Sequence, residues 1–451
     1  PYTMRYLKLL SQGGRCEVEG VHLRELANPD VHEAQFCSSD ARLNVLFEAG
    51  RETLRQNAVD IFMDCPSRER AGWLGDSFFT ARVACDLSGH TLIERDFLEN
   101  FLLPDCFSNI PDGMIPMCYP ADHPNGVFIP NWALWFVLEL EEYVGRSGDR
   151  DLAEALRPRV LKLLEYLRRF ENSDGLLERL KGWVFIEWSK ANEFVQDVNY
   201  PTNMLYAAAL EAAGRMYGLP ELTRRADMLR QVIRQQSFDG TFFVDNAMRE
   251  GGSLRPTGNR TEICQYYAFF FGICSPETHP DLWQRLLDEF GPRRQATGAY
   301  PEVHPANAFM GNYLRMELLS RYGHCRQLLE ESVDYLLYMA ERTGTLWENI
   351  GPTASCNHGF ASHVVHVLYR DILGLYRVDK PNCVVHVRLA DLPLHWCSGR
   401  MPLGKDAVSL QWRRSGGGTQ FRIQVPAGYE VRVENLTGGE LTETVKWPAM
   451  G

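Results

Sequence analysis

The sequence predicts a mainly α-helical fold: an (α/α)6 barrel of six inner and six outer helices, flanked by short N-terminal β-strands and a C-terminal antiparallel β-sandwich. Twelve segments between about residues 40 and 380 repeat apolar residues with the period of a helix. Apolar runs that alternate with turns precede them, and strand-like runs follow them. With 451 residues, 45% of them hydrophobic and 23% charged, the chain has the composition of a globular protein with a large core.

The first 39 residues are expected to form the end of an N-terminal β-domain and a linker. The apolar run Met4–Leu10 is followed by Gly13 and Gly14, which is typical of a strand that enters a turn. The segment is too short to be a domain of its own. We therefore expect a longer parent chain, in which further β-domains could lie upstream.

Residues 40–380 are expected to form the barrel. The first helix follows the start signal Ser38-Ser39-Asp40 and places Leu43, Leu46 and Leu54 on one face. Eleven further helices are predicted by the same pattern, near 75–87, 91–105, 130–146, 150–170, 202–217, 219–236, 261–272, 280–290, 310–321, 325–341 and 358–372. Twelve helices joined as consecutive hairpins are the number that an (α/α)6 barrel needs.

Residues 381–451 are expected to form the β-sandwich. Four alternating runs predict strands, at 384–387, 408–412, 421–425 and 429–433. The run Gly416-Gly417-Gly418 predicts a tight turn between two of them. No helix follows these glycines, so they do not predict a phosphate-binding loop.

Charge and hydropathy exclude two classes of partner. The chain has 47 basic and 58 acidic residues, a net charge of −11, and no basic stripe, so nucleic acid is not an expected partner. No run of about 18 apolar residues predicts a membrane span. No signal peptide is visible, which favours a cytoplasmic over a periplasmic or secreted location, although the absence of an initial Met suggests a truncated chain.

Cofactor and metal signatures are also missing from the sequence. The twelve cysteines include no CxxC pair, which argues against a zinc ribbon or thioredoxin chemistry. His363 and His366 have a spacing that suits a metal, but no HExxH-type carboxylate accompanies them. No pattern indicates a nucleotide, flavin or haem, so we expect neither a metal nor a cofactor.

The densest group of chemically active residues is the segment 64–76. It carries three carboxylates, two guanidinium groups and one indole in thirteen positions between two predicted helices. A salt-bridged connection between helices is the plain interpretation. Trp73, however, lies among small residues, where its ring could form a platform for the apolar face of a sugar.

Two other loops share this combination of acidic and aromatic residues. Glu348 follows Trp347, and His358 opens the last predicted helix; the loop 182–188 holds three aromatic rings and Glu187. Glycosidic cleavage needs one carboxyl as an acid and a second as a base or nucleophile, which two separate carboxyl clusters would provide. A buried aromatic loop remains the alternative for residues 182–188.

The segment 64–76 resembles the signature of glycoside hydrolase family 78, the α-L-rhamnosidases, in which Asp-Cys-Pro-x-Arg precedes Glu-Arg-x-Gly-Trp-x-Gly-Asp. The order of barrel and β-domains resembles this family as well. The resemblance implies that Glu69 is the general acid and Glu348 the general base. It further implies a set of substrate-binding residues around them: Asp64, Arg68, Trp73, Asp76, Glu187, Trp188, Trp347 and His358.

This chain departs from the family pattern in two places. Many members have an additional Asp between the Arg and the Glu, so the position of Asp64 relative to Glu69 differs here. Leu74 replaces a commoner Thr. The spacing from Glu69 to Trp73 and Asp76 matches the pattern.

The resemblance implies an inverting exo-glycosidase that hydrolyses terminal α-L-rhamnosides, with an oligosaccharide or glycoside as its substrate. Inversion requires the two carboxyls roughly 6.5–9.5 Å apart, and Glu69 is expected to be buried beside Trp73. One alternative is a related barrel exo-glycosidase that acts on another deoxy or uronic sugar. Another is a carbohydrate-binding homologue without catalytic activity.

Overall fold

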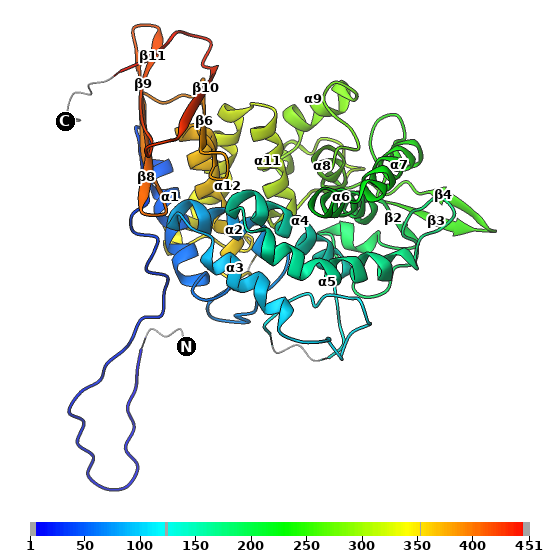
Figure 1. Cartoon of the computed structure of the whole chain (residues 1–451), viewed down its shortest axis with the longest axis horizontal. Helices are drawn as coiled ribbons and strands as arrows, with labels where there is room; N and C mark the ends of the chain where they lie inside the picture. The colour runs from blue at the N-terminus through cyan, green and yellow to red at the C-terminus, as the bar shows by residue number, and fades with distance from the viewer. Residues whose placement is uncertain (1–5, 122–124, 352, 445–451) are drawn as a thin grey trace.

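The computed structural model describes residues 6–121, 125–351 and 353–444, and these residues form a helical barrel with β-sheets beside it (Figure 1). Inner and outer helices alternate along the chain. The outer helices are α1 (Ala41–Asn57), α3 (Leu92–Glu99), α5 (Arg150–Arg168), α7 (Pro220–Ser237), α9 (Pro280–Glu289) and α12 (Cys325–Thr343). The inner helices are α2 (Asp76–Ser88), α4 (Pro130–Ser147), α6 (Tyr200–Tyr217), α8 (Glu262–Phe270), α11 (Tyr313–Arg321) and the segment 359–373.

The predicted (α/α)6 barrel is confirmed, and its last inner helix is irregular. The segment 359–373 consists of the 3-10 helix η4 (Gly359–His363), one α-helical turn, α13 (Val364–Val367), and the π-helical η5 (Leu368–Leu373). The expected helix at 310–321 begins as an α-helix only at Tyr313, because Phe309 and Met310 leave helical geometry. The expected helix near 91–105 consists of α3 and the 3-10 turn η1 (Asn100–Leu102), whereas η2 (Lys190–Glu193) and α10 (Arg294–Thr297) were not predicted from the sequence.

The helix boundaries follow ordinary capping chemistry. The side chain of Asp40 accepts a hydrogen bond from the Arg42 N–H at the start of α1, and Asp149 does the same for Leu152 in α5. Pro130 occupies the first turn of α4, where its missing N–H costs nothing. Gly148 ends α4 with a φ of 75°, a conformation that suits glycine.

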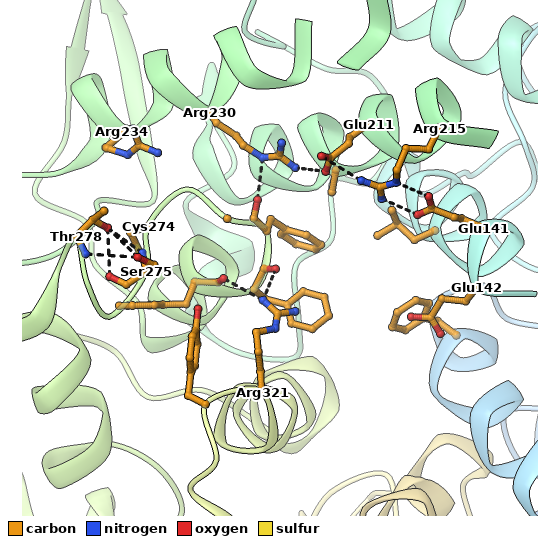
Figure 2. Close-up of a pocket in the computed structure, with 18 residues that line it drawn as sticks. Glu141, Glu142, Glu211, Arg215, Arg230, Arg234, Cys274, Ser275, Thr278 and Arg321 are labelled. Atoms are coloured by element: carbon orange, nitrogen blue, oxygen red, sulfur yellow. Dashed lines mark hydrogen bonds and ion pairs between the residues drawn. The ribbon is translucent and has the colours of Figure 1, made fainter. Parts of the chain in front are cut away.

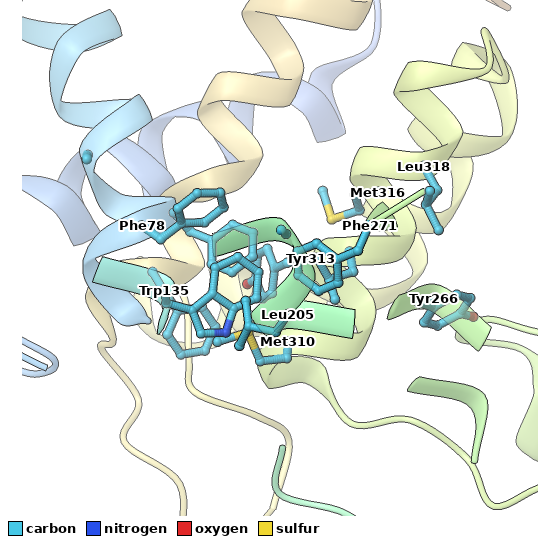
Figure 3. Close-up of a cluster of buried hydrophobic side chains, with 14 of the residues drawn as sticks. Phe78, Trp135, Leu205, Tyr266, Phe271, Met310, Tyr313, Met316 and Leu318 are labelled. Atoms are coloured by element: carbon cyan, nitrogen blue, oxygen red, sulfur yellow. The ribbon is translucent and has the colours of Figure 1, made fainter. Parts of the chain in front are cut away.

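Burial distinguishes the two layers. In the outer helix α5 the buried residues, among them Leu156, Val160 and Leu163, lie on one face. In the inner helices nearly every side chain is buried, and aromatic rings fill the centre (Figure 3). Phe78 of α2 packs against Trp135 of α4 with ring centroids 4.7 Å apart.

Contacts of the last inner helix, the segment 359–373, with α11 on one side and α2 on the other close the ring. The Tyr313 ring of α11 lies 5.0 Å from the Phe360 ring of η4. His363 Nε2 lies 2.7 Å from Glu317 Oε1 of α11. The segment 359–373 also packs against α2 and α1. The barrel core is therefore continuous around its axis.

Two sheets lie beside the barrel. One has the order β1-β7-β8-β9-β11 and the other the order β10-β6-β5. The strands are β1 (Gln35–Ser38), β5 (Leu375–Asp379), β6 (Val384–Ala390), β7 (Trp396–Leu403), β8 (Asp406–Ser415), β9 (Gly418–Gln424), β10 (Glu430–Leu436) and β11 (Leu441–Glu443). The expected antiparallel pairing is found for β1 with β7, β7 with β8, β8 with β9 and β5 with β6, but β10 pairs with β6 and β11 with β9 in parallel. The predicted turn at Gly416 and Gly417 joins β8 to β9.

The sheets hold the end of the barrel through buried polar contacts. Arg388 of β6 donates a hydrogen bond of 2.6 Å to Asp371 in η5. The Trp412 indole of β8 donates to the carbonyl of Leu373 at 3.0 Å. β1 adds an N-terminal segment to this C-terminal sheet by pairing with β7. A third, small sheet at 198–256 contains β2 (Val198–Asn199), β3 (Asn246–Glu250) and β4 (Ser253–Pro256).

The N-terminal strand expected at residues 4–10 is not found in its described part, residues 6–10. This segment belongs to an arm that extends away from the barrel (Figure 1). Tyr6 is 85% and Leu10 74% exposed, so no neighbouring strand supplies hydrogen bonds or apolar contact. Among the described residues, no helix has the length and apolar character needed to cross a membrane.

Candidate active site

A cavity of about 240 Å³ lies where the inner helices begin. Its position follows from the elements around it: Asp76 opens α2, Ile129 precedes α4 and His358 precedes η4. Eight of the ten residues predicted for the site line this cavity. They are Asp64, Arg68, Glu69, Trp73, Asp76, Trp188, Glu348 and His358.

The loop between α1 and α2 carries four of these residues, with Asp76 directly after it at the start of α2, and it is held by backbone bonds. The Asp64 N–H donates to the carbonyl of Ala71 at 3.1 Å, and the Gly359 N–H donates to the carbonyl of Asp64 at 2.7 Å. A side chain at Gly72 would meet the carbonyl oxygen of Tyr119 at 2.6 Å. Glycine is therefore required there, directly before Trp73.

The loop after α12 brings Glu348 to the cavity. The Leu346 N–H donates to Thr53 Oγ1 of α1 at 2.8 Å, and the His358 N–H donates to the carbonyl of Leu346 at 3.0 Å. Glu348 also exchanges backbone and side-chain contacts with Ser355. These bonds connect the first and last hairpins of the barrel, so residues far apart in the sequence share one site.

Glu69 and Glu348 face the same guanidinium group. Arg68 Nη2 lies 3.3 Å from Glu69 Oε1 and 3.6 Å from Glu348 Oε2. The Trp73 indole N–H donates to Glu69 Oε2 at 2.8 Å. The expected burial of Glu69 is not found, because its side chain is 33% exposed, whereas that of Glu348 is 12% exposed.

Asp76 and His358 form a buried pair in the same cavity. His358 Nε2 lies 2.9 Å from Asp76 Oδ1, and both side chains are less than 10% exposed. Burial raises the pKa of Asp76 to about 6, although the hydrogen bond with His358 opposes this shift. Burial lowers the pKa of His358, but the hydrogen bond and charge of Asp76 outweigh it and raise this pKa above its usual value.

Asp64 and His358 keep polar atoms without hydrogen-bond partners among the described residues. Asp64 Oδ1 accepts the Ala71 N–H at 3.0 Å, while its buried Oδ2 and the Nδ1 of His358 have no such partner. Buried polar atoms are normally paired, so these two are candidates to bind hydroxyl groups of a ligand.

The other half of the cavity is apolar, and its residues, apart from Trp188, were not among those predicted for the site. Five further residues line it: Ile129, Trp132, Trp183, Phe185 and Phe309. Trp183 and Phe185 belong to the aromatic loop noted in the sequence, but Trp132 lies in an apolar helix where its pattern resembles ordinary core. Phe309 comes from an irregular turn, which has no periodic signal.

Glu187 and Trp347 do not line the cavity, in contrast to the prediction. Glu187 is 0% exposed, and its carboxylate accepts the backbone N–H groups of Asn307 and Gly311 at 3.2 and 3.0 Å. Trp347 is 6% exposed and donates its indole N–H to Thr343 Oγ1 at 2.7 Å. Each side chain points into the protein because its neighbour in the sequence takes the place at the cavity.

A second cavity, of about 540 Å³, lies where the inner helices end (Figure 2). Arg215 binds Glu141 at 2.6 Å, and Arg230 binds Glu211 at 2.5 Å. These opposite charges compensate each other, and the cavity contains none of the predicted site residues. The described residues also contain no group of three His, Cys, Asp or Glu side chains arranged to hold a metal ion.

Known proteins with similar sequences and folds are described as rhamnosidases. An alpha-L-rhamnosidase of Formosa agariphila is 21% identical over 435 residues, 88% of this chain and 43% of that protein. The structure of a GH78 family rhamnosidase of Bacillus sp. GL1 superposes with a TM-score of 0.80 at 23% identity, covering 93% of this chain and 44% of that one. An alpha-L-rhamnosidase of Streptomyces avermitilis has a TM-score of 0.64 at 17% identity, covering 89% and 38%.

The chain thus spans less than half the length of these proteins. The model of the bacterial alpha-L-rhamnosidase six-hairpin glycosidase domain matches residues 32–372. This match includes the barrel from α1 to nearly the end of η5, together with every residue that lines the cavity. The chain therefore belongs to the bacterial alpha-L-rhamnosidase six-hairpin glycosidase family.

Proposed function

We propose that this barrel hydrolyses terminal α-L-rhamnosides with inversion at the anomeric carbon. The observation that carries the proposal is that Glu69 and Glu348 both lie within 3.6 Å of Arg68 Nη2 in a cavity of single-sugar size. The names of the family and of the similar proteins support rhamnose as the sugar, and the Streptomyces avermitilis structure is described as complexed with L-rhamnose.

In this mechanism Glu69 donates a proton to the glycosidic oxygen, and Glu348 removes a proton from the attacking water. Because Glu69 Oε1 and Glu348 Oε2 lie 3.3 and 3.6 Å from one nitrogen, these oxygens are at most about 7 Å apart. This limit includes the lower end of the roughly 6.5–9.5 Å of inverting enzymes and also the shorter separation of retaining ones, so inversion is proposed from the family resemblance. The Trp73 indole orients Glu69 through its hydrogen bond. A bound sugar would displace water from the exposed side of Glu69 and strengthen these interactions.

The two halves of the cavity suit the two faces of a 6-deoxy sugar. Asp64, Asp76 and His358 offer polar atoms for ring hydroxyls. Apart from the indole N–H groups of Trp132, Trp183 and Trp188, the aromatic half has apolar side chains, which can pack against a methyl group. Four carboxyls and only two basic side chains line the cavity, so the carboxylate of a uronic sugar would meet excess negative charge.

Proton NMR of a small panel of aryl glycosides tests this function. We expect α-L-rhamnoside to be cleaved and the β-anomer to appear first, because the water attacks the face opposite the leaving group. The variants Glu69→Gln and Glu348→Gln should each lose at least about 100-fold in kcat. Cleavage of another glycoside in preference would instead support the related-sugar alternative.

Three further outcomes would overturn parts of the proposal. Release of the α-anomer first would exclude inversion, since retaining enzymes pass through a covalent intermediate with carboxyls about 5–5.5 Å apart. Rhamnose binding without hydrolysis of any glycoside would indicate a carbohydrate-binding homologue. Unchanged activity of Glu69→Gln would refute its assignment as the acid.

A further inference from the structure

Glu187 connects two separate loops that form the aromatic half of the cavity. It lies in the loop 182–188, whose Trp183, Phe185 and Trp188 line the cavity. Its carboxylate binds the N–H groups of Asn307 and Gly311 in the second loop. One residue further, the carbonyl of Trp188 accepts a hydrogen bond of 2.5 Å from the Asn307 side chain.

The second loop is strained at the residue that follows the cavity wall. Phe309 lines the cavity, and Met310 has φ 72° and ψ −64°, a turn conformation that a non-glycine residue adopts only when its surroundings impose it. Met310 is 0% exposed. The Phe309 ring packs against Trp132 at 5.7 Å and Phe360 at 4.4 Å.

The two N–H groups bound by Glu187 lie on opposite sides of this turn. Asn307 precedes it and Gly311 follows it, so the carboxylate clamps both ends. The approach is close: a Cβ at Gly311 would lie 2.8 Å from Glu187 Oε2. Without an acceptor at this place the buried Gly311 N–H and the part-buried Asn307 N–H would lose these hydrogen bonds, and the strained turn would have less to hold it.

We propose that Glu187 is a positioning residue that holds Phe309 in the cavity wall and thereby sets the selectivity for a methyl group over a hydroxymethyl group on the sugar. The inference rests on the proposed function, because it takes the aromatic half as the place of the rhamnose methyl. Glu187 acts only through backbone and does not touch the sugar.

Burial raises the pKa of Glu187 well above its usual value, and the hydrogen bonds from Ser189, Asn307 and Gly311 act in the opposite direction. The side chain of Glu262 also lies near, since it accepts the Ala306 N–H at 3.3 Å and is itself bound by Arg294 at 2.9 Å. Glu262 therefore holds the part of the loop before the turn. Glu187, in contrast, binds the N–H groups on both sides of the turn.

The test compares two aryl glycosides that differ only at C6, the α-L-rhamnoside and the α-L-mannoside. The readout is the ratio of their kcat/KM values, because any loss of folded enzyme cancels in it. A hydrophobic pocket rejects an added hydroxyl by about 100-fold, and we expect Glu187→Gln to lower the ratio roughly tenfold. In the variant, the amide NH2 replaces one acceptor oxygen and opposes a backbone N–H.

Three further variants make the test specific. Glu94→Gln changes another buried carboxylate, 1% exposed and paired with Arg146 away from the cavity, and should leave the ratio unchanged. Phe309→Ala should lower the ratio directly, and adding Glu187→Gln to it should lower the ratio no further. Gly311→Ala should also lower the ratio, since its Cβ would lie 2.8 Å from Glu187 Oε2 and 2.5 Å from Ala306 Cβ, so that the carboxylate and the second loop must both shift.

An unchanged ratio in Glu187→Gln, or a double variant whose effects simply multiply, would overturn the inference. Absence of rhamnosidase activity in the wild type would overturn the proposed function alone. In that case acrylamide quenching of tryptophan fluorescence tests the positioning role of Glu187. Trp132 is 2% exposed in the wild type, and loosening of Phe309 would expose it. Glu187→Gln should raise quenching relative to Glu94→Gln, and Trp132→Phe should remove this difference; equal quenching would refute the positioning role.

Discussion

Replacing Asp76 by Asn should change how the stability of the protein depends on pH. The Asp76 carboxyl is 7% exposed at the start of α2 and lies 2.9 Å from His358. Burial raises its pKa from 3.8 to about 6. The pKa of His358 is raised as well, because the hydrogen bond and charge of Asp76 outweigh the effect of burial.

Both shifts act on stability with the same sign. The folded protein holds a proton on Asp76 that the unfolded chain has already lost, so this stabilisation is present below pH 3.8 and disappears as the pH rises through about 6. The stabilisation from His358 is present below pH 6.5 and disappears as the pH rises through its raised pKa. The amide of the Asp76→Asn variant has no proton to lose. Only the smaller effects of the Glu348 and Asp64 charges then oppose burial at His358, so its pKa should fall relative to the wild type.

The expected effect is about 3 kcal/mol, from about two pKa units for Asp76 at roughly 1.4 kcal/mol each. The unfolding free energy of Asp76→Asn, relative to the wild type, should rise by this amount between about pH 4 and pH 7. At about 2.1 cal/mol/K per residue, unfolding of 451 residues has an entropy of about 0.9 kcal/mol/K, which converts 3 kcal/mol to about 3 °C in Tm.

Calorimetric unfolding of both proteins across this pH range measures the effect, and kcat/KM on an aryl rhamnoside is measured in parallel. We expect the variant to gain relative stability with rising pH while losing activity, because Asp76 lines the cavity. A difference in Tm that stays constant from pH 4 to pH 7 would refute the reasoning, since it would mean that Asp76 titrates alike in the folded and unfolded states.

Three other substitutions separate stability from catalysis. Trp73→Phe keeps a ring but removes the N–H that binds Glu69 at 2.8 Å, so kcat/KM should fall roughly tenfold. An unchanged kcat/KM would show that this hydrogen bond does not contribute to catalysis. Arg68→Lys loses the planar group between Glu69 and Glu348 and should lower kcat/KM by about tenfold. Its Tm should not change, since the Arg68 side chain is 50% exposed; a large fall would contradict this. Asp245 is a fully buried carboxyl, and burial raises its pKa to about 7. The Asp245→Asn variant should therefore gain stability relative to the wild type as the pH rises towards neutral, and it should keep its activity. A loss of activity would instead place Asp245 in the site.

Local patterns were sufficient for the barrel but not for the sheets. The helices at 150–168 and 325–343 repeat apolar residues along one face, and this periodicity is present in the chain before it folds. Parallel pairing of β10 with β6 joins strands that the sequence separates by three other strands, β7, β8 and β9. The run Met4–Leu10 has strand character, but a strand forms only where a partner strand is available.

The site shows the same division at the level of single residues. The dense segment 64–76 and the loop at Glu348 could be identified as chemically active from composition and from a family motif. Glu187 and Trp347 have the same composition signal, yet they point away from the cavity. Trp132 lines it, although its helix predicts an ordinary buried residue.

The sequence by itself determined the helical barrel, the family and the residues of the acid and base loops, because helical periodicity and a dense motif are properties of neighbouring residues. The tertiary structure alone decided which side of each loop faces the cavity, that Arg68 bridges Glu69 and Glu348, and that Phe309 completes the aromatic wall. Those features depend on contacts between the first, third, fifth and last hairpins, and such contacts exist only once the inner helices have closed their ring.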